Sequence, residues 1–168
     1  VTKLIARRVR DLGVFSEILT PKEIYKIKDF NHVKGIILSG GPSTVTKGNY
    51  QSIPKQIFQK NIPILGICYG LQLIAKMYGG KIKSSKKKRE FGRVFIFKKK
   101  NSILTKNFFS KQSSVWMSHE DAVVRLPKKF KAVAYTSNSK LTIIENSKKK
   151  IFGVQFHPEV THTDNGKQ

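Results

Sequence analysis

The sequence predicts an α/β domain with a three-layer open sheet that is mainly parallel in its first half and is followed by a β-rich second half. Three observations support this prediction. Residues 62–80 have the pattern of a buried strand, a tight turn and a helix. Strand-like and helical segments alternate before them, and short strand-like segments follow one another after about residue 81. A length of 168 residues suits one domain spanning the chain.

The segment 62–80 contains the only cysteine of the chain. Residues 62–67 form a near-continuous apolar run, as expected for a strand covered on both faces, and residues 71–78 have helical spacing. Cys68 lies at the turn between Gly66 and Gly70, which is the pattern of a nucleophile elbow with sulfur in place of oxygen. The small neighbours permit the sharp turn, and the following helix N-terminus favours a thiolate. We therefore expect Cys68 to be a nucleophile, with an ordinary buried cysteine as the alternative.

The first 60 residues predict further alternating elements. Gly13 is expected to end the first helix, and Thr20 with Glu23 forms a capping-box pattern that opens the second. Short connections between such elements are typical of a doubly wound, flavodoxin-like sheet. The predicted elements are a helix over 2–12, a strand at about 14–19, a helix from Pro21 to about Lys28, a strand over 33–38 and a short helix over 54–60.

Two glycines follow the strand predicted at 33–38. Gly40 and Gly41 stand between Ser39 and Pro42, and glycines at the carboxyl end of a strand allow a backbone N–H group to point into a site. A plain turn explains the same residues equally well.

The second half of the chain has a strand-like pattern, and its last strand ends in a second candidate site. His157 and Glu159 flank a proline there, and a thiol nucleophile needs a base and a group that orients that base. A histidine alone is more often structural, as we expect for His32 and His162, so the pairing with Cys68 carries this prediction. The predicted strands are 91–97, 115–118, 123–126, 132–136, 141–145 and 151–156.

The composition limits the classes of function. The net charge of +23 comes mostly from scattered lysines, with short runs at 86–88, 98–100 and 148–150. Such charge suggests nucleic acid, but the runs fall at expected loops without interleaved aromatic residues, so a solvated lysine-rich face is preferred. A single cysteine excludes an internal disulfide. Without a long apolar segment or a signal-peptide pattern, a cytoplasmic protein with no membrane partner is expected.

The two candidate motifs together resemble the class I glutamine amidotransferases, whose glutaminase domain carries a G-x-C-x-G elbow and a late H-P-E. Here these motifs are Gly66 to Gly70 and His157 to Glu159. The resemblance covers essentially the whole chain and is strongest to the GMP synthetase branch. The stretches that carry it are TKLIARRVRDLG at 2–13, ILSGGPST at 37–44, REFG at 89–92, VWMSHED at 115–121 and GVQFHPEVTHT at 153–163.

The resemblance implies a class I glutamine amidotransferase-like fold and a thioester reaction. Cys68 would attack the side-chain carboxamide of glutamine, and ammonia would leave. His157 would act as general base and then acid, and Glu159 would orient the imidazole ring.

The resemblance also implies a set of residues that bind the substrate. The backbone N–H groups of Gly41 and Tyr69 would form an oxyanion hole, which the elbow geometry also requires of Tyr69. Glutamine would be bound partly by Gln72 and by the backbone around Ser118 and His119. For Gln72 an exposed helix position is the alternative.

The partners implied by the resemblance are glutamine and an ATP-pyrophosphatase synthetase domain or subunit that uses the ammonia to aminate XMP to GMP. No cofactor is expected in this domain, because ATP and magnesium would belong to the synthetase. Relatives begin with a strand before the match to Thr2 and continue beyond the match to residues 165–167. We therefore expect a glutaminase domain over 1–168 that is truncated at both ends and is a fragment of a larger enzyme. Glu120 stands where relatives usually have glycine.

Two other interpretations stay open at this point. One is the glutaminase of another pathway, such as anthranilate or carbamoyl phosphate synthesis, against which the residues 160–163 argue. The other is a basic non-enzymatic binding module, or a nucleic-acid binder, on the same fold.

Overall fold

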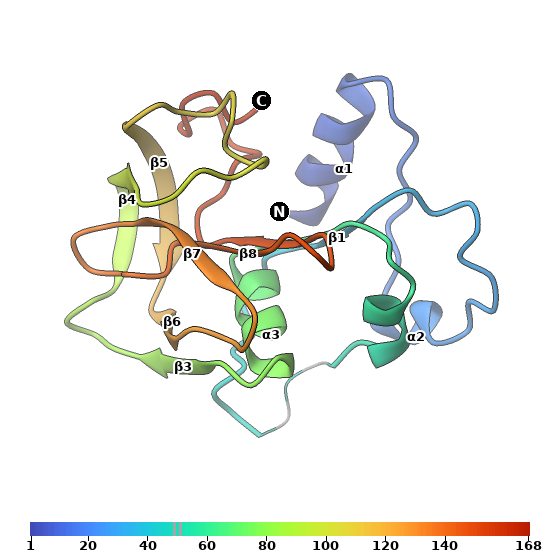
Figure 1. The fold of residues 1–168 in the computed structure, drawn as a ribbon. Helices are drawn as coiled ribbons and strands as arrows, with labels where there is room; N and C mark the ends of the chain where they lie inside the picture. The colour runs from blue at the N-terminus through green and yellow to red at the C-terminus, as the bar shows by residue number, and fades with distance from the viewer. Residues whose placement is uncertain (49, 51) are drawn as a thin grey trace.

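The chain folds as shown in Figure 1, a computed structural model that describes residues 1–48, 50 and 52–168. The helices and strands are α1 (Thr2–Asp11), α2 (Pro21–Ile24), β1 (Ile36–Leu38), the 3-10 helix η1 (Lys55–Gln59), β2 (Ile64–Ile67), α3 (Tyr69–Met77), β3 (Lys81–Ser84), β4 (Glu90–Lys98), β5 (Gln112–His119), β6 (Asp121–Arg125), β7 (Lys131–Tyr135), β8 (Ile143–Asn146) and β9 (Ile151–Val154).

A curled, seven-stranded mixed sheet forms the centre of the fold, in the order β1-β2-β9-β8-β7-β4-β5. The strands β1, β2 and β9 are parallel, whereas the remaining pairs are antiparallel. The last strand of the chain therefore pairs with β2, and Val154 stands opposite Ile67. Because both strands run in the same direction, the segments that follow them emerge at the same edge of the sheet. A separate antiparallel pair, β3 with β6, lies outside this sheet.

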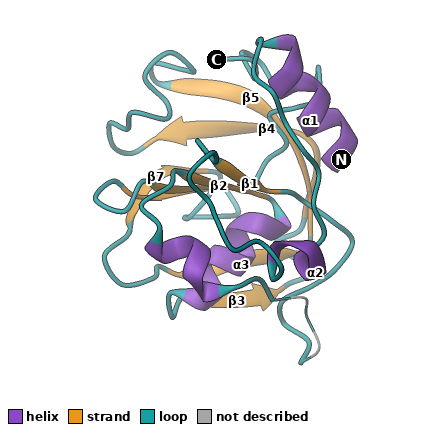
Figure 2. Cartoon of the chain, turned by 90° about the vertical axis from the view of Figure 1, so that its right-hand side faces the viewer, coloured by secondary structure: helices purple, strands orange, loops and turns teal. Residues whose placement is uncertain are grey.

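The two faces of the sheet bury two apolar clusters, which gives the three layers. On one face, α3 and η1 pack against a cluster that includes Ile64, Leu71 and Ile144. On the other face, Ile5 of α1 contributes to a cluster that includes Ile67 and Phe156. Figures 1 and 2 show α1 and α3 on opposite sides of the sheet. The alternation of neighbouring strand residues between the two clusters is what a sheet covered on both faces requires.

The end of α1 and the start of α2 were predictable from local chemistry. Gly13 adopts φ +76° just after α1, as expected of a glycine that ends a helix. The capping box at α2 is complete, because the Thr20 side chain accepts from the Glu23 backbone N–H and the Glu23 carboxylate accepts from the Thr20 backbone N–H. The helix ends at Ile24, however, and is shorter than the predicted helix to Lys28. The prediction for 54–60 is realised as the 3-10 helix η1.

The strand predicted at 14–19 is wrong. Residues 14–20, all of which the structure describes, form an irregular segment, and β1 is the edge strand of the sheet. The side chain of Phe15 is 88% exposed, so the apolar residues of this segment do not form a buried strand face. A strand needs a neighbour for its backbone groups, and the sequence pattern carries no information on whether one is present.

The other differences concern strand ends and one missed strand. The strand predicted at 33–38 is reduced to β1, and β3 was not predicted because its sequence KIKS is short and polar. All six strands predicted in the second half are present with boundaries shifted by a few residues. The predicted fold class is confirmed, since the first half is parallel and the second half is β-rich. Among the residues that the structure describes, no helix is both long and apolar enough to cross a bilayer.

Candidate active site

Cys68 occupies the turn between β2 and α3 and has a strained backbone. Its φ of 53° and ψ of −105° lie outside the allowed regions for a residue with a side chain, and the side chain is only 7% exposed. Such a conformation costs about 1–3 kcal/mol and persists only where the surroundings impose it. The predicted elbow is therefore present, with the sulfur directly at the start of a helix.

The two glycines that frame Cys68 are required by close packing and not by positive φ. A Cβ atom at Gly70 would lie 2.0 Å from the carbonyl oxygen of Leu38 in β1. A Cβ atom at Gly66 would lie 2.5 Å from the carbonyl carbon of Gly70. The strand, the turn and the helix can approach this closely only because both positions lack a side chain.

His157 and Glu159 follow β9 and are buried together. The Nδ1 atom of His157 lies 2.8 Å from Oε1 of Glu159. The backbone of His157 is also held, because its N–H donates to the Trp116 carbonyl at 3.0 Å and its carbonyl accepts from Thr163 Oγ1 at 2.7 Å. The ring orientation is thus fixed from the carboxylate side and from the main chain, as a histidine that exchanges protons requires.

The pairing of β2 with β9 brings Cys68 and His157 together. The Cys68 N–H donates to the Val154 carbonyl at 2.8 Å, which fixes the elbow on the neighbouring strand. Burial by itself lowers the pKa of His157, but hydrogen bonds and electrostatic interactions with Cys68 and Glu159 raise that pKa to about 9. At neutral pH the ring therefore carries a proton and faces the sulfur as an imidazolium.

Gly40 lies against both residues. A Cβ atom placed on Gly40 would be 3.1 Å from Cε1 of His157 and 3.3 Å from Cβ of Cys68. Gly40 is buried, whereas the neighbouring Gly41 is exposed and a Cβ atom there would meet nothing within 4 Å. Gly41, which was predicted for the oxyanion hole, therefore follows the glycine that packs against Cys68 and His157. Tyr69, the other predicted oxyanion-hole residue, is the first residue of α3.

Of the residues predicted to bind glutamine, Ser118 contacts the sulfur, whereas the side chains of Gln72 and His119 bind other groups. Cys68 Sγ lies 3.8 Å from the Ser118 carbonyl oxygen, so the end of β5 borders the site. Gln72 is 3% exposed, which excludes the exposed helix position, and its Nε2 donates to the Asp121 carbonyl at 2.8 Å. The side chain of His119 points away from solvent and contacts Glu90 at 3.0 Å.

Three residues near the site were not singled out from the sequence. Gly40 was treated only as part of a glycine pair. Gln155 donates from Nε2 to Cys68 Sγ at 3.7 Å, and a single polar residue inside the apolar run 151–156 was the available signal. Glu90 is 3% exposed although it follows a lysine-rich run, so its sequence context indicated a surface position.

Glu120 is compatible with the turn between β5 and β6. It is not among the residues of the described chain that have a positive φ, so glycine is not needed there for backbone reasons. The side chain is exposed and lies 3.9 Å from Arg89.

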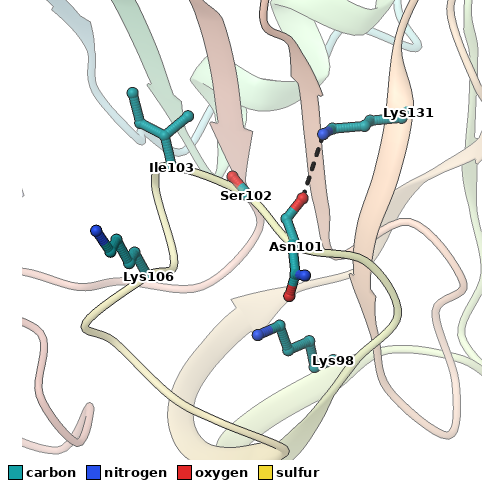
Figure 3. A pocket seen from close by; sticks show the side chains of 6 residues that line it. All are labelled: Lys98, Asn101, Ser102, Ile103, Lys106 and Lys131. Carbon is teal, nitrogen blue, oxygen red and sulfur yellow. Dashed lines mark hydrogen bonds between the residues drawn. The ribbon is translucent and has the colours of Figure 1, made fainter.

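A lysine-lined hollow lies apart from these residues and shares none of them. Figure 3 shows Lys131 beside Asn101, and the Lys131 ammonium donates to the Asn101 carbonyl at 3.2 Å and lies 2.8 Å from the Glu145 carboxylate. The hollow is lined by Lys98, Asn101, Ser102, Ile103, Lys106 and Lys131. Its lining includes neither a cysteine nor a histidine, so its chemistry does not compete with that of Cys68. Within the described residues, no cluster of three or more histidine, cysteine or acidic side chains is placed to hold a metal ion.

The strained cysteine elbow and the buried His–Glu pair on a three-layer sheet define a class of protein. The family model described as "Glutamine amidotransferase class-I" matches residues 1–168, and the chain belongs to this family. Solved structures agree with the fold. A glutamine amidotransferase from Thermotoga maritima has a TM-score of 0.72 at 26% identity, covering 94% of this chain and 70% of that one.

Within the family, the similar proteins include GMP synthases. The "GMP synthase [glutamine-hydrolyzing]" of Aquifex aeolicus is 48% identical over 99% of this chain, and that of Brachyspira hyodysenteriae is 46% identical over 98%. The crystal structure of a protein assigned as a GMP synthase subunit, from Thermoplasma acidophilum, has a TM-score of 0.83 at 27% identity, covering 99% of this chain and 82% of that chain. The chain spans about a third of the length of the curated relatives, 32% in both cases.

Proposed function

We propose that this chain hydrolyses glutamine to glutamate and ammonia through a thioester on Cys68. The observation that carries the proposal is the convergence of a strained cysteine and a buried His–Glu pair where β2 and β9 end side by side. The sulfur attacks the carboxamide carbon of glutamine, and the resulting tetrahedral oxyanion expels ammonia. A water molecule then cleaves the thioester and releases glutamate.

His157 moves the protons in this reaction. Because its pKa is raised to about 9, the ring holds the proton that Cys68 gives up at neutral pH, and it donates this proton to the nitrogen that leaves as ammonia. In the second step the same ring accepts a proton from the attacking water. Glu159 keeps Nδ1 bound at 2.8 Å, so that the other ring nitrogen is the one that exchanges protons.

The oxyanion and the substrate are bound by the residues around the elbow. The backbone N–H groups of Gly41 and Tyr69 stabilise the negative oxygen, and the helix N-terminus adds to that stabilisation. Gln72 and the backbone around Ser118 and His119 bind the glutamine. This part of the proposal is supported by the 3.8 Å contact between Cys68 Sγ and the Ser118 carbonyl.

The ammonia is proposed to serve a synthetase domain or subunit that aminates XMP to GMP. The names of the relatives support this proposal, since they are GMP synthases of which the chain spans about a third. The synthetase is expected to be an ATP-pyrophosphatase that holds ATP and magnesium, with no cofactor in the glutaminase domain. The glutaminase of another pathway is not favoured by these relatives.

The central test replaces Cys68 with alanine. We expect glutamate release to fall to background, while thermal unfolding shows that the variant remains folded. A matched pair of histidine variants extends the test, because His157→Gln should abolish glutamate release and His32→Gln, at an exposed position, should leave it within about twofold. Glutamate release that persists in Cys68→Ala would contradict the proposal.

The partner is tested separately. The glutaminase rate is measured with and without the synthetase partner loaded with ATP and XMP, and stimulation is expected because such coupling links the two sites. Equal rates would contradict the coupling but would leave the Cys68 chemistry intact.

A further inference from the structure

A buried acid–histidine pair outside the proposed catalytic residues is connected to Gln72 through the Asp121 carbonyl. Glu90 on β4 and His119 on β5 are register partners across the two strands, and Oε2 of Glu90 lies 3.0 Å from Nε2 of His119. Both side chains are 2% exposed. The mechanism proposed above uses neither side chain.

The hydrogen bonds of His119 define which ring nitrogen carries a proton. Nδ1 lies 3.0 Å from the Asp121 carbonyl, and a carbonyl oxygen can only accept, so Nδ1 must donate. Nε2 then either donates to the Glu90 carboxylate or accepts from the protonated acid. In both cases Glu90 fixes the ring with its Nδ1–H directed at the Asp121 carbonyl.

The Asp121 carbonyl also contacts Gln72, which is proposed to bind glutamine. It accepts from Gln72 Nε2 at 2.8 Å, and Gln72 Nε2 lies 3.4 Å from Gln155 Oε1. The amide group of Gln72 is therefore held by its nitrogen, which leaves its oxygen as the polar atom that neither bond uses. A shift of the Asp121 carbonyl would rotate this amide relative to the substrate.

The Glu90–His119 pair includes a destabilising buried atom, which packing alone does not explain. Oε1 of Glu90 is buried and, within the described part of the chain, has no hydrogen-bond partner. A buried carboxylate oxygen without a partner destabilises the fold, and an apolar pair at this position of two neighbouring strands would avoid that cost. A positional role for the pair accounts for its presence.

We propose that Glu90 and His119 are positioning residues that hold the Asp121 carbonyl and, through it, the Gln72 amide in the geometry that binds glutamine. The inference rests on the proposed function, because Gln72 is assigned to substrate binding there. It adds residues on β4 and β5 that act on KM without contacting the reacting atoms.

The test uses two replacements of His119 that imitate one ring nitrogen each. The amide nitrogen in His119→Asn can reach the position of Nδ1 and keep the bond to the Asp121 carbonyl, whereas that in His119→Gln imitates Nε2 and keeps only the bond to Glu90. In the intact protein we expect KM for glutamine to be roughly five to ten times higher in His119→Gln than in His119→Asn, from the loss of one hydrogen bond. Equal KM values in the two variants would overturn the inference, because both remove the same ring from the core.

Replacements of Glu90 give a second comparison. Glu90→Ala should raise KM for glutamine. Glu90→Gln can donate from its amide to Nε2 and preserve the Nδ1–H tautomer, so its KM should stay close to that of the original protein. Glu17→Ala, at an exposed position outside the segment from β4 to β6, is the control and should leave KM within about twofold. If Glu90→Ala does not fold, the comparison of His119→Asn with His119→Gln still decides the question.

Failure of this inference is distinguishable from failure of the proposed function. The rate at which iodoacetamide alkylates Cys68 should stay within about twofold in every Glu90 and His119 variant, since none of these changes touches the sulfur. If Cys68→Ala abolishes activity but the KM pattern is absent, only the positioning role is wrong. If Cys68→Ala retains activity, the function itself is wrong.

Discussion

Replacing Gly40 with alanine is the most informative single-methyl change at the proposed site. A Cβ atom at this position would lie 3.1 Å from His157 Cε1 and 3.3 Å from Cys68 Cβ, both closer than ordinary van der Waals contact. Neither Gly40 nor Gly41 has a positive φ, so alanine is compatible with the backbone at both positions. Gly41→Ala is therefore a matched control, because its methyl group would meet nothing within 4 Å and its backbone N–H is retained.

The size of the effect follows from the contacts. Relief of the two short contacts requires His157 and Cys68 to move apart by a few tenths of an ångström, and misplacement by about 1 Å costs roughly a hundredfold in rate. We expect Gly40→Ala to lower kcat for glutamate release about tenfold or more, with about 1 kcal/mol lost from the free energy of unfolding. Gly41→Ala should keep kcat within about threefold, since the N–H group proposed for the oxyanion hole is unchanged.

The assay is glutamate release at saturating glutamine, with thermal unfolding of each variant measured in parallel. A Gly40→Ala enzyme with at least half of the original kcat would refute the reasoning that this position sets the distance between sulfur and imidazole. Equal loss in Gly40→Ala and Gly41→Ala would refute it as well, because a methyl group at position 41 meets neither His157 nor Cys68.

Two further predictions concern pH and the elbow. The pKa of His157 is raised from 6.5 to about 9, so its proton contributes on the order of 3 kcal/mol to stability; this is fully present below pH 6.5 and is lost as the pH rises through about 9. Unfolding midpoints of the original chain and of His157→Gln, measured from pH 6 to 10, should therefore converge as the pH rises, and a constant difference would contradict the assigned proton. Gly70→Ala places a Cβ atom 2.0 Å from the Leu38 carbonyl and should destabilise the fold by about 3 kcal/mol. Denaturant unfolding measures this, and a loss no larger than in Gly41→Ala would show that the elbow tolerates a side chain at position 70.

The elbow was predictable because its signals are local. An apolar run, a cysteine between two glycines and a helical pattern are contiguous in the sequence, and the structure shows β2, Cys68 and α3 in that order. The capping box at Thr20 was predictable for the same reason, since all of its hydrogen bonds lie within four residues.

The features that could not be predicted from the sequence depend on distant contacts. The insertion of β9 beside β2 joins residues 64–67 to 151–154, and no periodicity indicates which strand becomes the neighbour. The burial of Glu90 depends on its partner His119 across β4 and β5. The strand predicted at 14–19 is the opposite case. Its sequence favours a strand, but the segment pairs with no strand of the sheet.

Covalent labelling of the cysteine tests the central claim most directly. A glutamine-analogue electrophile is incubated with the protein, and the modified peptide is identified by mass spectrometry, with excess glutamine as competitor. The account predicts one label on the peptide that contains Cys68, slowed by glutamine and absent from Cys68→Ala. A label on any other residue, or labelling of Cys68 that glutamine does not slow, would contradict the assignment of this elbow as the site of glutamine chemistry.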